Sequence, residues 1–135
     1  MYTGNLAITA IWSRLGNCDL DVQTPNGLDI AVMYQSGPTE YTDYGQMDAT
    51  SEITGPENVF WDTDTETPWG SYNICLEVFF FDDIVNDSMP LVATIFVRKP
   101  SMTTEIFTRT FTSKTDGIYL CYNNSVGYIA SITYP

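Results

Sequence analysis

The segment Gly70–Phe81 places the strongest constraint on the fold, because its apolar residues recur at every second position. This period of two matches a β-strand, in which successive side chains point to opposite faces of a sheet. One face is expected to lie in the core, and it carries Tyr72, Ile74, Leu76, Val78 and Phe80. The opposite face carries Asn73, Cys75, Glu77, Phe79 and Phe81. The outward aromatic side chains then need a covering loop or a partner.

The rest of the chain consists of short runs of strand-forming residues separated by turn signals. Further strands are predicted at residues 6–12, 19–24, 29–34, 59–61, 91–98, 105–112, 117–122 and 128–133. The segment Thr24–Gly27 is a predicted turn, because Pro25 presets φ and the Asn-Gly pair tolerates positive φ. Residues 35–56 are rich in Gly, Asp, Thr and Ser and are expected to form one long loop.

No segment follows the i, i+3, i+4 spacing of an amphipathic helix. Many short strands with frequent turn signals are typical of a sandwich or a barrel. The sequence therefore predicts an all-β fold in one domain over residues 1–135. We expect a single antiparallel β-sandwich, Ig-like or jelly-roll-like, of about eight or nine strands with a long acidic loop.

The charge of the chain limits its partners, since 5 basic residues face 17 acidic ones and the net charge is −12. Nucleic-acid binding needs a basic surface that releases counterions from phosphates, so a nucleic-acid partner is not expected. No apolar run is long enough to suggest membrane insertion, and Met1–Gly4 has no signal-peptide pattern. Only 16% of residues are charged. This polar but sparsely charged composition suits an extracellular or cell-surface protein.

Three cysteines and the absence of histidine argue for a disulfide rather than a zinc site. We expect one disulfide and one leftover thiol, if the compartment is oxidising. A Cys18–Cys75 bridge is favoured, because Cys75 points outward and Cys18 precedes an acidic strand; Cys75–Cys121 is the alternative. The sequons at Asn86 and Asn123 are candidate glycosylation sites.

Several motifs occur in a fixed order: Trp12, then Asp19-Leu20-Asp21, the turn Thr24–Gly27, Gly55-Pro56-Glu57-Asn58, and Gly70-Ser71-Tyr72 opening a long strand. Their order and spacing resemble the bacterial YfaP-type β-sandwich domain of unknown function, over roughly Ile8 to Thr112. This resemblance implies an extracytoplasmic sandwich that serves as an accessory module, and it implies no known catalysis.

The same acidic motifs suggest a cation site. Asp19 and Asp21 leave the same face of a predicted strand, about 7 Å apart, and calcium takes six to eight oxygen ligands. The residues that could complete a calcium site are Asp48, Glu57, Asn58 and Asp62. Alternatively, Asp19, Asp21 and Glu57 accept backbone N–H bonds that hold the long loop.

Catalysis is not expected, because without histidine no Ser-His or Cys-His activation exists. The favoured function is a non-catalytic extracellular structural module of an appendage, filament or particle surface, which associates with itself or with other surface proteins. The alternative is a calcium-dependent carbohydrate- or cell-surface-binding module. The aromatic residues that could form an interface or a glycan platform are Trp61, Trp69, Phe79 and Phe81.

Overall fold

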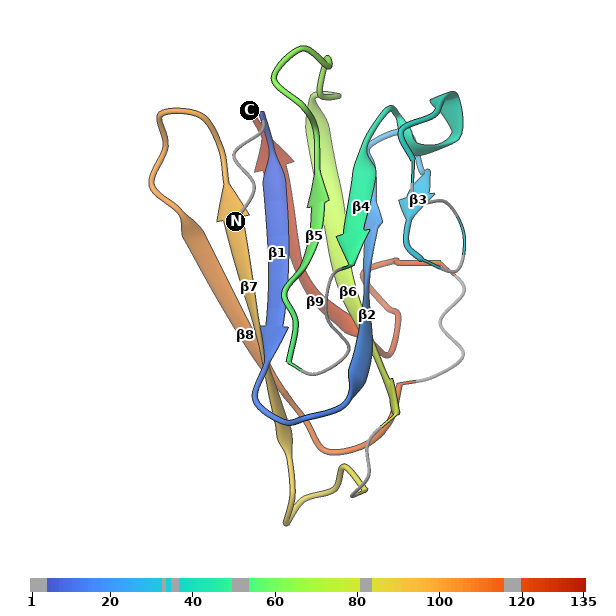
Figure 1. The fold of residues 1–135 in the computed structure, drawn as a ribbon, viewed down its shortest axis with the longest axis vertical. Coiled ribbons are helices and arrows are strands. Elements are labelled where there is room, and N and C mark those ends of the chain that lie inside the picture. The colour runs from blue at the N-terminus through green and yellow to red at the C-terminus, as the bar shows by residue number, and fades with distance from the viewer. Residues whose placement is uncertain (1–4, 33, 35–36, 50–53, 81–83, 116–119) are drawn as a thin grey trace.

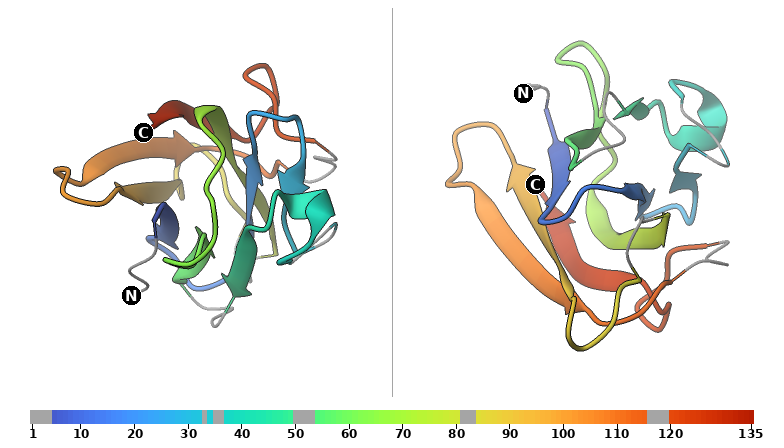
Figure 2. Two further views of the ribbon diagram at one scale, coloured as in Figure 1. Left: turned by 90° about the horizontal axis from the view of Figure 1, so that it is seen from above. Right: turned by 60° about the horizontal axis from the view of Figure 1, so that its bottom comes forward.

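A computed structural model of the chain describes residues 5–32, 34, 37–49, 54–80, 84–115 and 120–135. These residues form β-strands and one short 3₁₀ helix, η1 (Glu40–Thr42). The strands make two antiparallel sheets that pack face to face (Figure 1; Figure 2), which confirms the predicted all-β sandwich. Within the same ranges, no helix has the length and apolar character needed to cross a membrane.

The two sheets have different sizes. The five-stranded sheet has the order β4 (Gln46–Ala49), β5 (Glu57–Phe60), β1 (Ala7–Trp12), β7 (Leu91–Arg98), β8 (Glu105–Phe111). The four-stranded sheet has the order β3 (Asp29–Ile30), β2 (Asn17–Gln23), β6 (Gly70–Phe80), β9 (Tyr128–Tyr134). Strands β4 and β8 are therefore the edges of the larger sheet, and β3 and β9 are the edges of the smaller one.

The core lies between the sheets and follows the alternation of the strands. Leu20 lies opposite Leu76 across β2 and β6, and Ile8 lies opposite Val97 across β1 and β7. The predicted core residues Tyr72, Ile74, Leu76 and Val78 all belong to the buried cluster, which also contains Trp12 and Leu20. The side chain of Phe80 lies outside the described part of the structure.

One strand was missed by the sequence analysis. Strand β4 lies inside the region predicted to be a loop, and it pairs with β5 from Gln46 opposite Phe60 to Ala49 opposite Glu57. Its residues carry no run of β-branched or aromatic side chains, so this strand depends on its partner rather than on local propensity. Residues 120–122, predicted as strand, are not in one.

Leu76 tests whether the alternation of β6 carries the stability of the fold. Its side chain is fully buried, so Leu76→Ala should lower the free energy of unfolding by about 2–5 kcal/mol. Ile11→Ala is the matched control, because Ile11 is 38% exposed in β1 and should change stability by less than about 1 kcal/mol. Urea denaturation measures both. Equal effects of the two variants would contradict this packing.

Candidate functional site

The disulfide joins Cys75 to Cys121, with Cα atoms 5.8 Å apart, so the favoured Cys18–Cys75 pairing was wrong. Cys18 lies opposite Val78 and points into the core, whereas Cys75 points to the outer face of the same sheet. A bridge between them would have to pass through the sheet. Cys18 remains as a buried free thiol, as expected for one bridge and one leftover cysteine.

The disulfide holds a loop across the outer face of the four-stranded sheet. The loop begins beside β6 at Thr115, whose N–H donates to Val78 O at 2.9 Å. It returns to β6 at Gly127, whose carbonyl accepts from Leu76 N at 2.9 Å. Between these points Cys121 is bridged to β6, and its N–H donates to Asp29 on β3 at 3.0 Å. The loop thus reaches across β2, where Asp21 lies beneath it.

Two carboxyl groups are buried together under this loop. Asp21 is 4% exposed and Asp29 is 8% exposed, and a hydrogen bond links the two side chains. One buried oxygen of each, Oδ1 of Asp21 and Oδ2 of Asp29, has no hydrogen-bond donor in the described structure. Two carboxylates are both acceptors, so a hydrogen bond between them requires that one is protonated. The pair therefore shares one proton.

The environment of the pair places that proton on Asp21. Burial, together with the smaller effects of the negative charges of Asp29 and Glu77, raises the pKa of Asp21 to about 9. Burial also raises the pKa of Asp29, but the hydrogen bonds from Asp21 and from the Cys121 N–H oppose this rise. The hydrogen bond between them raises the pKa of Asp21 and lowers that of Asp29, so Asp21 donates and Asp29 accepts.

A second buried carboxyl group lies where the two sheets meet. Glu57 belongs to β5, and its side chain accepts a hydrogen bond from the backbone N–H of Leu20 on β2. It is 2% exposed, and burial with the charge of Asp19 raises its pKa to about 8. Glu57 therefore accepts a backbone N–H, as the structural alternative expected, but the donor belongs to a strand and not to the long loop.

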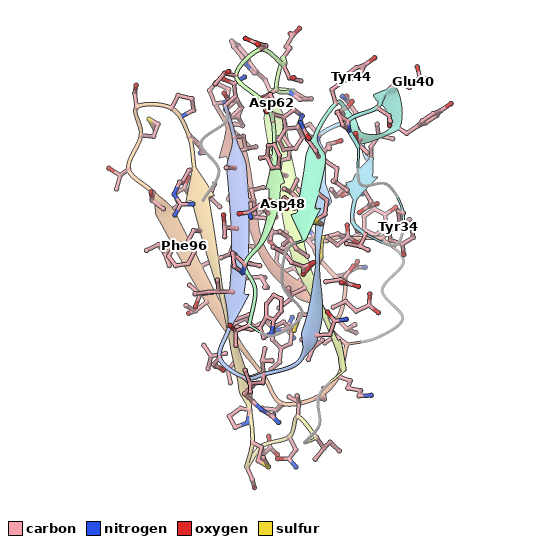
Figure 3. The ribbon with its side chains drawn as sticks, in the orientation of Figure 1. Tyr34, Glu40, Tyr44, Asp48, Asp62 and Phe96 are labelled. Atoms are coloured by element: carbon pink, nitrogen blue, oxygen red, sulfur yellow. A yellow bond between two sulfur atoms is a disulfide. The ribbon has the colours of Figure 1, made fainter. Side chains whose placement is uncertain are left out.

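The six predicted calcium ligands are not brought together. Asp19 and Asp21 share the outer face of β2, as predicted, and the charge of Asp19 acts on Glu57. Asp48 and Asn58 are paired on the five-stranded sheet, where Asn58 accepts from Thr9 at 2.7 Å. Asp62 lies in the loop after β5, well apart from Asp48 (Figure 3). Within the described ranges, no three His, Cys, Asp or Glu side chains form a group that could hold a metal.

The predicted aromatic residues also separate. Trp61 is fully buried, and its ring meets that of Tyr72 edge-on at 5.4 Å, so it cannot serve as a surface platform. Trp69 is 78% exposed, as a ligand-binding aromatic residue must be. Phe81 and the side chain of Phe79 lie outside the described residues. Of the sequons, Asn123 is exposed, and Asn86 accepts bonds from two nearby backbone N–H groups.

An open pocket of about 330 Å³ lies at the loop end of the sandwich. It is lined by residues from three loops, namely Asn26, Asp43, Tyr44, Glu66 and Pro68. Figure 3 shows Tyr44 at this end of the molecule, near the loop that carries Asp62. The sequence analysis recognised the turn that holds Asn26 but not the pocket, because the other residues come from distant loops.

Hydrogen bonds fix the floor of this pocket. Asp43 accepts from Thr24 at 2.5 Å and from Asn26 at 3.1 Å, and its carbonyl accepts from the Trp61 indole at 2.9 Å. These bonds hold both Asp43 and Tyr44 at positive φ, 50° and 62°. Non-glycine residues in this region are rare and cluster at ligand-binding sites. Tyr44 remains 55% exposed, so its ring is available to a ligand.

No family model, no curated protein and no solved structure matches this chain. The resemblance to the YfaP-type domain therefore stays a prediction.

The shared proton makes stability depend on pH. Asp21 has its ordinary pKa near 4 when unfolded and one of about 9 when folded, so the folded state binds more protons between these values. Stability should fall as pH rises from about 4 to about 9, by at most about 1.4 kcal/mol per pH unit from this group. Asp21→Asn should weaken this dependence and stabilise the protein at pH 8, because the amide donates to Asp29 without ionising. Denaturation at pH 5 and pH 8 measures it.

The exposed Asp64→Asn is the matched control, and it should leave the pH dependence unchanged. Equal slopes for Asp21→Asn and the wild type would contradict the shared proton. Calcium added at pH 8 separates a proton from a cation. A calcium-dependent rise in melting temperature that Asp21→Asn abolishes would identify the pair as a cation site instead.

Proposed function

We propose that the protein is a non-catalytic extracellular structural module that joins an assembly such as an appendage, a filament or a particle surface. The Cys75–Cys121 bridge supports a site of action outside the reducing cytosol, because disulfides persist in oxidising compartments. The net charge of −12 suits a protein that remains soluble until it meets its partner. An N-linked glycan on the exposed Asn123 would fit the same location.

The observation that carries this proposal is the open edge of β8. This strand is seven residues long, contains no proline, glycine or lysine, and ends the five-stranded sheet. It lies along the left margin of the molecule in Figure 1. An unpaired edge strand can pair with a strand of another chain, and the two charged residues of β8, Glu105 and Arg109, have opposite signs.

The edge strand β9 of the other sheet, unlike β8, has carbonyls that are bonded by side chains. Lys99 donates to Thr133 O at 2.6 Å, and Arg109 donates to the carbonyls of Val126 and Tyr128 at 2.8 and 2.6 Å. These side chains occupy carbonyls at and beside β9 that a further strand would need. In the described part of the chain no such bond reaches the outer edge of β8. The contrast singles out β8 as the joining edge.

The buried acids support a non-catalytic role. Asp21 and Asp29 are covered by the loop that carries Cys121, so no substrate reaches them. Glu57 is buried between the sheets. The chain has no histidine to activate a serine or cysteine nucleophile, and Cys18 is buried with its pKa raised by burial. These groups stabilise or tune the fold rather than react.

A second function, carbohydrate binding, is favoured by the pocket at the loop end. It combines an exposed aromatic ring, Tyr44, with the polar side chains of Asn26, Asp43 and Glu66. Aromatic rings stack on the apolar faces of sugars, and carboxylate and amide groups bond their hydroxyls. Glycan binding measured with and without a chelator also tests the calcium dependence expected from the sequence.

Location and thiol state test the structural proposal. In cells that make the protein, surface labelling should reach it, and alkylation after denaturation without a reductant should modify one thiol, Cys18. A Cys18→Ser variant should show none. Recovery from the cytosol with three modified thiols would refute the extracellular assignment.

Variants of the pocket test the second function. Tyr44→Ala should weaken binding to a responding glycan about 2- to 13-fold, since an aromatic contact contributes roughly 0.5–1.5 kcal/mol. Tyr41→Ala is the matched control, because Tyr41 is 62% exposed on η1 but does not line the pocket. A glycan panel with and without chelator provides the measurement. No binding in the panel, or equal loss in both variants, would remove the carbohydrate function.

A further inference from the structure

Strand β8 has a charge pattern that fits a second copy of itself. Its inward-facing residues alternate with outward-facing ones, since Phe107 pairs with Ile95 and Glu105 pairs with Val97, both buried residues of β7. Glu105 and Arg109 therefore lie on the same face, at equal distances on either side of Phe107. An antiparallel partner related by a two-fold axis at Phe107 places each Glu105 opposite an Arg109.

We propose that β8 pairs with β8 of a second copy of this chain, antiparallel and about a two-fold axis through Phe107. This inference rests on the proposed function and names its partner. Two Glu105–Arg109 ion pairs form across the junction, and the two Phe107 rings meet at its centre. On the outer face, Ile106 lies opposite Thr108 of the other copy. The two five-stranded sheets become one continuous sheet.

The competing register is disfavoured by charge. A two-fold axis at Thr108 would pair more residues within the strand, but it places Glu105 opposite Phe111 and leaves no oppositely charged pair. Directly opposed side chains of opposite charge contribute about 0.2–1 kcal/mol each, and like charges cost a similar amount. In the single chain Lys99 bonds Glu105 at 2.9 Å, and Arg109 bonds the carbonyls of Val126 and Tyr128, so each ion pair across the junction adds to these bonds.

The energetic drive comes from the backbone and from apolar contacts. Adding a strand gives partners to the N–H and C=O groups along the open edge of β8. Ile106 is 59% exposed in the single chain and loses part of that exposure beside Thr108. The net charge of −12 on each copy opposes association, so pairing is expected to require physiological ionic strength, where the Debye length is about 8 Å.

Charge reversal tests the partner and the register together by analytical ultracentrifugation of the full chain. The wild type should dimerise with increasing concentration, and Glu105→Lys and Arg109→Glu should each weaken the dimer about tenfold or more. A mixture of the two variants should restore dimers, because each Lys or Arg then faces a Glu. Glu66→Lys, a charge reversal at the distant pocket, is the control and should leave dimerisation unchanged. Thermal unfolding of each variant separates weakened pairing from loss of fold.

Cysteine cross-linking tests the register without changing charge. Opposed residues bring their Cα atoms within the 4.4–6.8 Å that a disulfide needs. A mixture of Ile106→Cys and Thr108→Cys should therefore form mixed disulfide dimers. Thr108→Cys alone would cross-link to itself only with the axis at Thr108.

The outcomes distinguish this inference from the proposed function. A wild type that stays monomeric at high concentration, or a dimer that both charge variants leave intact, would overturn the pairing of β8 with itself. Neither result changes the location or thiol state, on which the extracellular structural function is judged. A cytosolic protein that nonetheless shows charge rescue would overturn the function and keep the pairing.

Discussion

The bridge between Cys75 and Cys121 is the constraint on which most of the molecule depends. It closes a loop of 46 residues in sequence separation, and such a bridge contributes about 4 kcal/mol in the chain-entropy account. It also fixes where Cys121 lies, because Cys121 is joined to β6 and bonds Asp29 on β3, over part of the outer face of the smaller sheet. That cover gives this sheet a second, small buried layer, in which Asp21 and Asp29 are removed from water.

The two sheets thus differ in how far their outer faces and edges are covered by other segments. The disulfide-held loop covers part of the outer face of the smaller sheet, and the basic side chains of Lys99 and Arg109 bond carbonyls at and beside its edge strand β9. Both of these residues belong to the larger sheet or its hairpin. The cations that protect one sheet are therefore supplied by the other, and the chain has only 5 basic residues to distribute. The scarcity of positive charge leaves β8 without the lysine that commonly protects an edge.

Most of the fold could be predicted from the sequence, because alternation directly reports which face of a strand is buried. The same alternation correctly placed Asp19 with Asp21, and Cys75 on the outer face. It failed where tertiary contacts decide the outcome. Strand β4 forms only because β5 lies beside it, and the loop through Cys121 reads locally as a strand. The cysteine pairing failed because the predicted strand began at Asp19, whereas β2 begins at Asn17 and alternation then places Cys18 on the inward face with Leu20.

The candidate sites were harder to predict, since each combines distant segments. Asp29 meets Asp21 only through the hairpin of β2 and β3, and the pocket around Tyr44 needs three loops at one end of the sandwich. The predicted calcium site joined acidic residues of several segments, whereas Asp48 and Asn58 lie on the five-stranded sheet and Asp19 and Asp21 on the four-stranded one.

The position of Cys18 has a kinetic consequence. Its thiol lies in the core near Glu57, with no exposed surface, and burial raises its pKa. A thiol reagent can modify it in the native protein only after the core around β2 opens, because the thiolate is the reactive form and neither solvent nor reagent reaches it otherwise. The modification rate in the absence of denaturant therefore reports how often the core opens around Cys18. Cys18 is therefore a native reporter of the opening rate of the core, and no engineered label is needed.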